Sequence, residues 1–441
     1  MLRRYSGMQD PVESAAAASE WRALLAIAVP VVVVQVGLMF MGVVDTLMVG
    51  HLNAGALAAA AIGNLYVFNV AVVAMGTLMA LDPLVAQAVG ARDNVAVTRS
   101  IQRGLLLAGV LSIPTALALL PAAPLLRLFR QPATIIPDAA AFVRISAAGM
   151  LPFLVFVVLR QSLQAIGRLA PIVWTIIAAN VLNAGLNWVL IYGRVGAPAL
   201  GVRGSAIATT LSRWAMCALL LALAWRDLRA HVVKVDPASL ELRPLGRMLA
   251  LGLPIGLQQF LEVSAFAAVG LLMGTFGTEQ VASHQIALNM AALTFMVPLG
   301  VSAAAAVRVG HAVGAGDAAR ARRAARVSYG VGVGFMCATA VLFLTLPRPL
   351  AALYTPDVAI VGVASLLIPI AGVFQVFDGL QAVGAGVLRG LGDTRVPLLA
   401  MLAGYWLIGV PVSVGLGFWT DLGPVGLWWG FVAGLAAVAG F

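Results

Sequence analysis

The chain has 441 residues, of which 62% are hydrophobic and only 10% are charged. Soluble globular proteins have about 25% charged residues, so this composition leaves too little polar surface for a water-soluble fold and excludes that class. The formal net charge of +10 does not indicate nucleic-acid binding, because the basic residues stand in short gaps between apolar runs. We therefore expect an integral membrane protein that binds no nucleic acid.

Uninterrupted apolar runs predict twelve membrane-spanning helices and an all-α integral membrane fold. A helix needs about 20 apolar residues to cross a bilayer. The last run reaches Phe441 without a polar tail, as expected of a sequence that stops inside or just after its twelfth helix. In chain order the predicted helices are residues 23–50, 55–82, 104–125, 136–159, 171–192, 204–225, 247–273, 281–306, 328–347, 358–388, 397–418 and 425–441.

The positions of the basic residues predict the orientation of these helices. Lys and Arg residues are retained on the cytoplasmic side during membrane insertion. Twenty of the 27 Lys and Arg residues fall in the N-terminal tail and the even-numbered connections, and five fall on the opposite side. This distribution predicts a multi-pass protein of the bacterial inner membrane with both termini in the cytoplasm.

An internal repeat divides the chain into two halves. VAQAVGARD at residues 85–93 matches VGHAVGAGD at residues 309–317, and the same offset of 224 residues takes Pro30 to Pro254. Two copies of six helices enter the membrane in the same orientation, and such folds bind substrate between their lobes. We predict a cytoplasmic tail at 1–22, an N-terminal lobe at 23–225, a cytoplasmic linker at 226–246 and a C-terminal lobe at 247–441.

Three acidic residues stand out well inside predicted helices, where a charge costs at least about 2.5 kcal/mol. Asp45 lies late in the first helix, Glu262 in the middle of the seventh and Asp378 inside the tenth. We expect Glu262 and Asp378, both in the C-terminal half, to come together around one cation. A buried carboxylate carries a proton or binds a metal cation such as Na⁺, and the sequence leaves both roles open. The alternative is a structural role, such as pairing with an arginine.

Polar side chains on the fifth helix form a second candidate group. Asn183 and Asn187 are four residues apart and share one helix face, and Asn180 precedes them. These amides predict either a polar wall that faces Asp45 and binds substrate or protons, or ordinary hydrogen bonding between membrane helices.

Three other charged residues of the predicted helices bear on these sites. Arg144, near the start of the fourth helix, and Arg213, within the sixth, are candidates to neutralise Asp45. Asp82 precedes Pro83 close to the cytoplasmic end of the second helix. We expect Asp82 to be solvated at the membrane interface rather than to form a site.

Signatures of several enzyme classes are absent from the sequence. The single lysine, Lys234, follows a valine, so no Walker-type phosphate loop exists, and neither HExxH nor GxSxG occurs. We predict that the protein is not an enzyme, needs no cofactor and is driven by a gradient of Na⁺ or H⁺.

Several collinear segments resemble the MATE (multidrug and toxic compound extrusion) transporters, particularly the NorM-type branch. They include GVVDTLMVGHLNAGALAAAAIGN, NVLNAGLNWVLIYG, FLEVSAFA and FDGLQAVGAGVLRGLGDT, and they cover the chain from about Trp21 to its end. The resemblance implies two six-helix bundles that form a V around a central cleft. It also implies the export of cationic, lipophilic compounds against an inward flow of Na⁺ or H⁺.

By the same resemblance, Asp45, Glu262 and Asp378 match the family's acids on helices one, seven and ten, and the last two look like the Na⁺-site acids of the NorM-type branch. DinF-type relatives, which are proton-coupled, have an Asn and an Asp one turn apart on helix five. This chain has Asn183 and Asn187 there, which argues against a fifth-helix proton relay.

The partners that we expect are cationic drugs or dyes and the surrounding membrane lipids, and we expect the protein to act as a monomer. One alternative is a lipid-linked oligosaccharide flippase of the same superfamily, which tends to have a basic cleft. Another is a membrane-embedded lipid transferase, which would need a His, Cys or acid cluster at the bilayer surface, and the sequence shows none.

Overall fold

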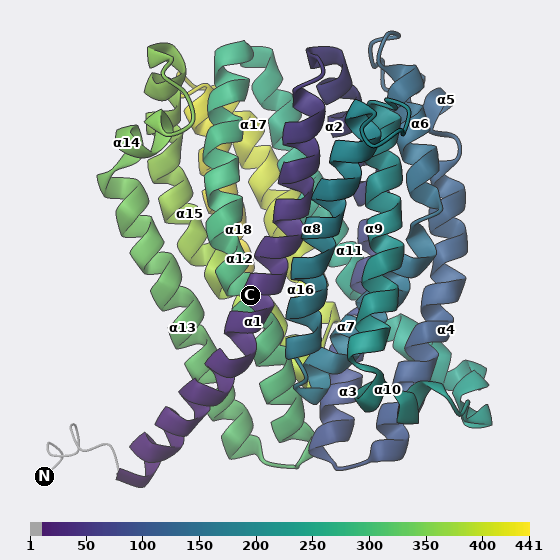
Figure 1. The fold of residues 1–441 in the computed structure, drawn as a ribbon. Helices are drawn as coiled ribbons and strands as arrows, with labels where there is room; N and C mark the ends of the chain where they lie inside the picture. The colour runs from purple at the N-terminus through teal and green to yellow at the C-terminus, as the bar shows by residue number, and fades with distance from the viewer. Residues whose placement is uncertain (1–10) are drawn as a thin grey trace, which may run out of the picture.

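The computed structural model describes residues 11–441, with side chains from residue 19 onward. Regular structure in this part of the chain is entirely helical, and Figure 1 shows the long helices standing side by side. The tail residues Arg3 and Arg4 lie outside the described residues. In chain order the elements are α1 (Pro11–Gly50), α2 (Ala54–Leu78), α3 (Leu81–Gly90), α4 (Asn94–Leu119), α5 (Ala122–Leu128), α6 (Ile136–Ala147), α7 (Met150–Ile166), α8 (Ala170–Tyr192), α9 (Val202–Leu223), α10 (Trp225–Val232), η1 (Pro237–Leu240), α11 (Leu242–Met273), η2 (Gly274–Phe276), α12 (Thr278–Gly314), α13 (Ala318–Thr345), α14 (Pro347–Ala352), α15 (Val358–Leu391), α16 (Arg395–Met401), η3 (Leu402–Gly409), α17 (Val410–Phe418) and α18 (Pro424–Gly440).

The predicted spans all correspond to helices of the structure. In the described part of the chain, ten helical segments are long and apolar enough to cross a membrane, with α2 and α3 forming one of them and α16 to α17 another. The pair α6 and α7, bent by 52°, passes the same test when taken together. The remaining predicted span is α18, an apolar helix of 17 residues.

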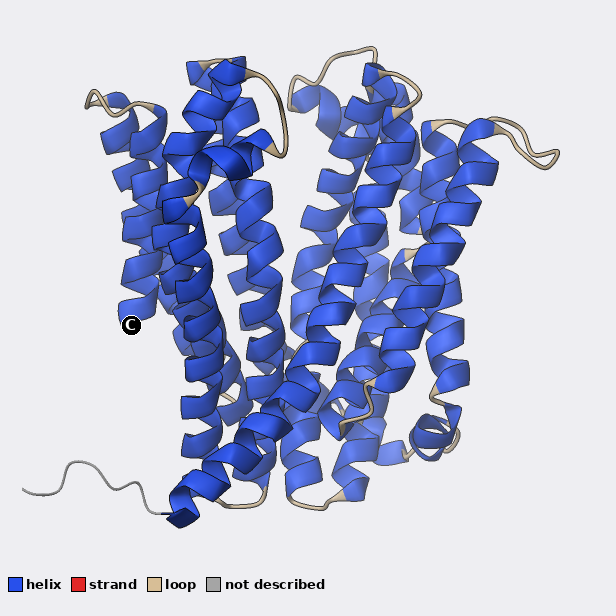
Figure 2. Ribbon diagram, turned by 60° about the vertical axis from the view of Figure 1, so that its left-hand side comes forward, coloured by secondary structure: helices blue, strands red, loops and turns tan. Residues whose placement is uncertain are grey.

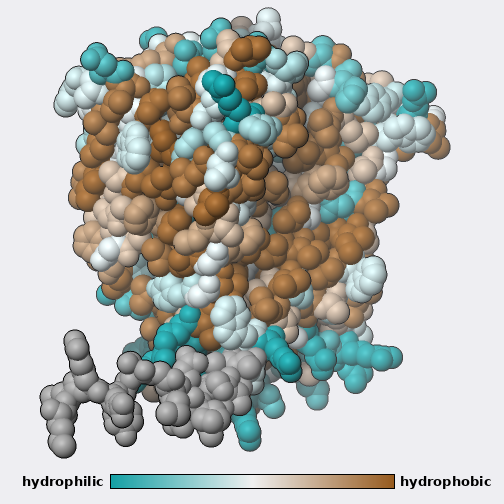
Figure 3. All heavy atoms as spheres, turned by 90° about the vertical axis from the view of Figure 1, so that its left-hand side faces the viewer, coloured by the Kyte–Doolittle hydropathy of each residue, from teal (hydrophilic) through white to brown (hydrophobic). Residues whose placement is uncertain are grey.

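Apolar side chains cover the outside of the helices. Val29, Phe40, Trp174 and Leu407 are among the many large apolar residues that are exposed. Figure 3 shows such residues covering the middle of one face, with hydrophilic residues gathered along its lower edge. A protein surface of this kind requires lipid around it.

Several helices extend beyond the apolar runs that predicted them. α4 begins at Asn94 rather than 104, and α13 at Ala318 rather than 328. Each is capped by an aspartate, since Asp93 accepts a hydrogen bond from the backbone N–H of Ala96 and Asp317 from that of Arg320. Hydropathy missed these first turns because they are polar and basic, although the backbone is already helical.

The first helix also begins earlier than predicted. α1 starts at Pro11, within the segment that we expected to be a tail. Proline suits the first position of a helix, and the alanines that follow it have the highest helix propensity.

The two halves of the helix bundle meet at one end of the molecule. We call α1–α9 the N-terminal bundle and α11–α18 the C-terminal bundle; α3 packs against α12, and α2 against α11. Gly90 packs against the backbone of His311, and Gly314 against that of Gln87. These glycines are equivalent positions of the internal repeat, so the repeated motif is the point where the two bundles cross.

Polar contacts between the bundles also gather at this end. Within the described residues, the bundles are joined by hydrogen bonds or ion pairs of Glu20 with Arg308, Met79 with Gln259 and Arg389, Asp82 with Arg389, Gln87 with Gly390, and Ala165 with His311. Figure 2 shows the ribbons of the two bundles converging at the lower end and diverging toward the upper end. The charge distribution predicts that the lower end faces the cytoplasm.

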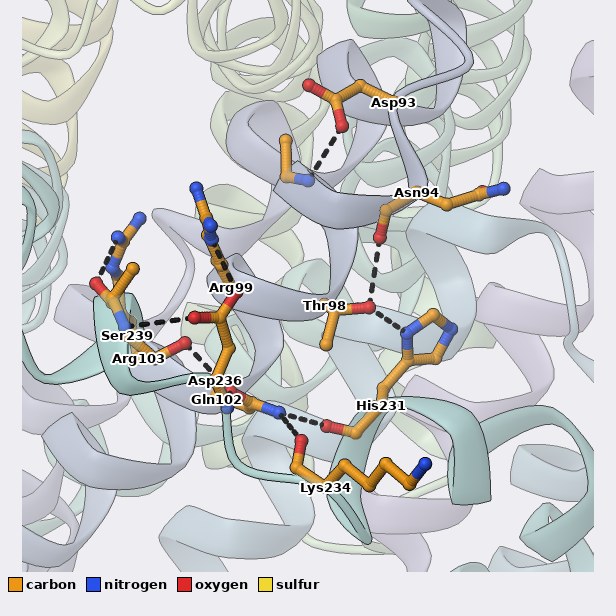
Figure 4. A network of polar contacts seen from close by, with 12 residues as sticks. Asp93, Asn94, Thr98, Arg99, Gln102, Arg103, His231, Lys234, Asp236 and Ser239 are labelled. Atoms are coloured by element: carbon orange, nitrogen blue, oxygen red, sulfur yellow. Dashed lines mark hydrogen bonds and ion pairs between the residues drawn. The ribbon is translucent and has the colours of Figure 1, made fainter.

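The linker between the bundles is fixed to α4 by a network of hydrogen bonds (Figure 4). The Gln102 side chain donates to the carbonyl groups of His231 and Lys234 at 2.8 and 2.7 Å and accepts a bond from Ser239. Arg99 Nε donates to Asp236 Oδ2 at 2.7 Å, and this bond holds the pKa of Asp236 below its usual range. The linker therefore packs on the N-terminal bundle.

Candidate functional site

Asp45 lies inside the N-terminal bundle, where α1, α8 and α9 meet. Its side chain is 4% exposed. Asn187 Nδ2 donates to Asp45 Oδ1 at 2.5 Å, and Thr209 Oγ1 donates to Asp45 Oδ2 at 2.8 Å. Asn187 also donates to Asn183 Oδ1 at 3.1 Å. The structure thus brings together three of the residues predicted to form this site, and it adds Thr209.

Asn180 plays a different part from the other two asparagines. Its Nδ2 donates to the carbonyl oxygens of Gly37 and Ile176 at 3.0 and 2.9 Å. The bond to Gly37 joins α8 to α1. Asn180 therefore makes the contact between helices that was the alternative to a binding role, whereas Asn183 and Asn187 face Asp45.

Of the two arginines considered as partners of Asp45, only Arg213 is near it. Arg144 is exposed, and its Nε donates to the carbonyl oxygen of Leu120 at 3.3 Å, so that prediction is wrong for Arg144. Arg213 follows Thr209 by one turn of α9, and its charge acts on Asp45. Its guanidinium carbon lies 4.9 Å from the centre of the Phe153 ring. Its positive charge therefore lowers the negative potential at Asp45.

Glu262 and Asp378 share the interior of the C-terminal bundle. Glu262 lies on α11 and is partly buried, and Asp378 lies on α15 and is 6% exposed. The charge of Glu262 acts on Asp378, and both act on the hydroxyl group of Tyr405. The indole of Trp406 donates to the carbonyl oxygen of Leu261 at 3.1 Å and so joins η3 to α11 beside Glu262.

Several oxygen atoms around these two acids are buried and free to accept or bind. Among the described residues, Asp378 Oδ1, Gln381 Oε1 and Tyr405 Oη have no hydrogen-bond partner. Gln381 Nε2 contacts the sulfur of Met401 at 3.8 Å, one turn before Tyr405. Tyr405 belongs to the π-helix η3, and such segments are frequent at functional sites.

None of the three predicted acids is neutralised by an ion pair in the part of the chain that the structure describes. The ion pairs there involve other acids, namely Glu20, Asp82, Asp138, Asp227 and Asp236. A carboxylate in such surroundings needs a proton or a cation to offset the loss of water. Glu262 and Asp378 thus have no ion pair with an arginine among the described residues, whereas Asp45 has the charge of Arg213 nearby.

Asp82 is not solvated, and our interfacial prediction for it is wrong. Its side chain is 0% exposed and lies 3.7 Å from Arg389 Nε of the C-terminal bundle. The chain breaks between α2 and α3, and α3 then packs against α7, α12 and α15. This turn carries Asp82 into the contact between the bundles instead of the membrane surface.

Comparison with known proteins identifies the family. A family model described as MatE matches the chain twice, at residues 30–189 and 254–414. The chain belongs to the MATE family. The two matches begin at Pro30 and Pro254, the offset at which the sequence repeats. MATE proteins are transporters and not enzymes, which confirms the prediction of a transporter.

Two relatives in the MATE family align with nearly the whole of this chain. The multidrug resistance protein NorM of Burkholderia vietnamiensis is 39% identical over 94% of this chain and 90% of its own length. A probable multidrug resistance protein NorM of Rhizobium meliloti is 38% identical over 96% of this chain and 92% of its own length. The resemblance to the NorM-type branch is therefore confirmed.

Solved structures confirm the MATE fold. A eukaryotic MATE transporter has a TM-score of 0.88 at 23% identity, covering 96% of this chain and 94% of that one. An outward-facing multidrug resistance MATE family transporter of the MOP superfamily has a TM-score of 0.86 at 20% identity, covering 98% and 96%. At these identities the likeness concerns the fold.

Sequence reasoning missed Thr209, Gln381 and Tyr405. Each is a polar residue inside an apolar run, which is a detectable signal, but neutral polar residues are common in membrane helices. The hydrogen bond of Thr209 to Asp45, and the buried oxygen atoms of Gln381 and Tyr405 without a partner, distinguish them from ordinary packing residues.

Proposed function

We propose that this MATE protein is a secondary active exporter of cationic, lipophilic compounds in the bacterial inner membrane, with both termini in the cytoplasm. Export is coupled to an inward flow of Na⁺ or H⁺. The observation that carries the proposal is the pair of acids Glu262 and Asp378, which share a buried region without a basic partner among the described residues. The names of the NorM relatives support multidrug compounds as substrates.

The residues of the C-terminal bundle fit a sodium ion. Na⁺ is a hard cation that takes oxygen ligands, as Ca²⁺ and Mg²⁺ do. Glu262 and Asp378 supply carboxylate oxygens. Gln381, with a free oxygen, is on the same helix as Asp378, and Tyr405, also with a free oxygen, is on η3, which packs against α11. When the cation leaves, these negative groups attract either its replacement or a cationic drug.

Competition for negative charge couples the two flows. One acidic site does not bind the ion and a cationic drug at the same time, because its negative charge offsets only one of them. Binding of one therefore favours release of the other. If the bundles rock about their contact and expose the acids to each side in turn, the ion gradient drives export. In the N-terminal bundle, both oxygens of Asp45 already accept hydrogen bonds, which favours a drug or proton role there over a metal site.

The test is transport of ethidium in proteoliposomes, with Na⁺ and H⁺ gradients imposed separately. Glu262→Gln and Asp378→Asn should each abolish the ion-driven part of export, because both replacements keep the size of the side chain and remove its charge. The matched controls are Glu279→Gln and Asp421→Asn, which change exposed acids of the same bundle and should leave export unchanged. Unchanged export in both site variants would refute the proposal, and the gradient that drives wild-type export identifies the ion.

The relatives favour the exporter over the flippase. A flippase needs a basic surface for its phosphorylated lipid, whereas the region of Glu262 and Asp378 contains two acids and the buried neutral oxygens of Gln381 and Tyr405. An overproducing strain should therefore tolerate several unrelated cationic drugs.

A further inference from the structure

Asp82, Arg389 and Arg160 form a charge cluster at the contact between the bundles, and we call these three residues the interface cluster. Asp82 and Arg160 belong to the N-terminal bundle and Arg389 to the C-terminal bundle. Their side chains are almost completely removed from solvent, with exposures of 0%, 9% and 7%. The cluster lies outside the region of Glu262 and Asp378, and the proposed coupling does not use it.

The cluster is electrostatically unbalanced. Arg389 Nε lies 3.7 Å from Asp82 Oδ2, and the charges of both arginines act on Asp82. The two positive charges thus face one negative charge. Among the described residues, neither oxygen of Asp82 has a hydrogen-bond partner. The attraction of Asp82 for Arg389 therefore acts through charge alone, without the geometry of a hydrogen-bonded pair.

Each arginine is anchored in its own bundle by other contacts. Arg160 Nη1 donates to Gln35 at 2.9 Å within the N-terminal bundle, and Arg389 Nη2 donates to Ser302 at 3.3 Å within the C-terminal bundle. Separation of the bundles would leave both of these bonds intact and would break the attraction between Asp82 and Arg389. The interface cluster is therefore a contact that exists only while this end is closed.

Glycine contacts between the bundles bring the surfaces around the cluster close together. Gly90 and Gly314 bring the backbones of α3 and α12 close together, and Gly76 of α2 lies against Gly256 of α11. Parting of these surfaces would expose the cluster to water. Opening hydrates all three charges, whereas closing pairs one arginine and leaves an excess positive charge buried.

We propose that the interface cluster sets the balance between the closed and open forms of the cytoplasmic end, with Asp82 holding the bundles together and Arg160 opposing it. This inference rests on the alternation of the two bundles in the proposed function, and it adds the residues that control that alternation. A buried charge whose partner is removed is strongly unfavourable. The sign of each substitution then follows from the charges that remain across the contact.

The three charges predict an order of effects. Asp82→Asn removes the charge that attracts Arg389 across the contact and leaves both buried arginines without an acidic partner, so the open form should gain most. Arg389→Gln removes the attraction across the contact, but Asp82 keeps Arg160 of its own bundle as a basic partner, so opening should be smaller. Arg160→Gln leaves a neutral pair across the contact and should favour the closed form.

The experiment measures the distance between spin labels at Val95→Cys and Ala319→Cys by pulsed electron paramagnetic resonance. These exposed positions are equivalent in the internal repeat and begin α4 and α13 at the cytoplasmic end. The free cysteines Cys217 and Cys337 are first replaced by serine. Asp82→Asn should raise the ratio of long to short distances at least about tenfold.

The matched control is Asp138→Asn. Asp138 also lies 3.7 Å from an arginine, Arg203, but this pair is exposed and lies within the N-terminal bundle. Its removal should leave the distances unchanged. The double variant Asp82→Asn with Arg160→Gln should return part of the distribution toward short distances, because it removes one of the two buried charges that the first change leaves without a partner.

Two results would overturn the inference. One is an unchanged distribution in Asp82→Asn, and the other is equal opening by Arg160→Gln and Asp82→Asn, which a purely packing role would produce. If a single variant does not fold, the double variant Asp82→Asn with Arg160→Gln still tests the inference, because its recovery of short distances depends on charge. Because the distances are measured without ions or dye, failure here leaves the proposed antiport untouched, and failure of transport leaves this test intact.

Discussion

Gly90 and Gly314 are equivalent positions of the repeat, and each leaves no room for a side chain at the contact between the bundles. Gly90→Ala would place a Cβ atom against the carbonyl oxygen of His311, and Gly314→Ala against that of Gln87. A helix backbone cannot rotate out of the way, so the bundles must move apart. Overpacking of this kind costs about 1–3 kcal/mol, which is a change of about 5- to 150-fold in the closed-to-open ratio.

The assay is the distance between the two spin labels at the cytoplasmic end, with thermal unfolding of the same samples. Both variants should shift the population toward long distances while each bundle stays folded. Gly109→Ala and Gly334→Ala are the matched controls, because a Cβ atom at either position meets nothing within 4 Å. Alanine favours the helix over glycine by up to about 1 kcal/mol, so the controls should be neutral or stabilising.

The outcome that would refute this reasoning is specific. If Gly90→Ala and Gly314→Ala behave as the controls do, the closed contact is either loose enough to accept a methyl group or rarely formed. A loss of secondary structure in both variants would show instead that the contact is needed for folding.

Three further predictions concern the linker and the N-terminal site. Gln102→Ala should speed cleavage by a lysine-specific protease at Lys234 about tenfold, because losing the hydrogen bonds of Gln102 weakens the docked linker by about 1–3 kcal/mol. Burial lowers the pKa of His231 below its usual value, so the docked linker is most stable above about pH 6.5 and weakens as the pH falls. Cleavage at Lys234 should therefore rise as the pH falls, after a reference peptide has been used to correct for the pH dependence of the protease itself. Asn187→Ala should lower stability by about 1–3 kcal/mol, measured by thermal unfolding, because it removes the donor to the buried Asp45.

Controls for these predictions come from the same chain. Asn180→Ala should cost only about 0.6 kcal/mol, because the carbonyl groups that Asn180 contacts belong to helix backbone. An equal loss in the two asparagine variants would contradict the role assigned to Asn187. A cleavage rate that is constant with pH would show that His231 does not contribute to docking.

The sequence alone established the membrane fold, the internal repeat and the three acids inside the helices. Apolar runs locate spans because every span must avoid exposing polar groups to lipid. The acids are conspicuous for the same reason, since a charge that is costly in a membrane helix needs a local explanation. These inferences need only the properties of one segment at a time.

The tertiary structure alone decided which of these residues meet. Asp82 looked like an interfacial residue, and only the packing of α3 against the other bundle shows that it faces Arg389, more than 300 residues away in sequence. Tyr405 and Thr209 looked like neutral packing residues until their helices placed them beside the acids. Hydropathy reports how much a residue avoids water, whereas the face on which it meets a distant partner depends on how the helices pack, and packing is set by shape over the whole chain.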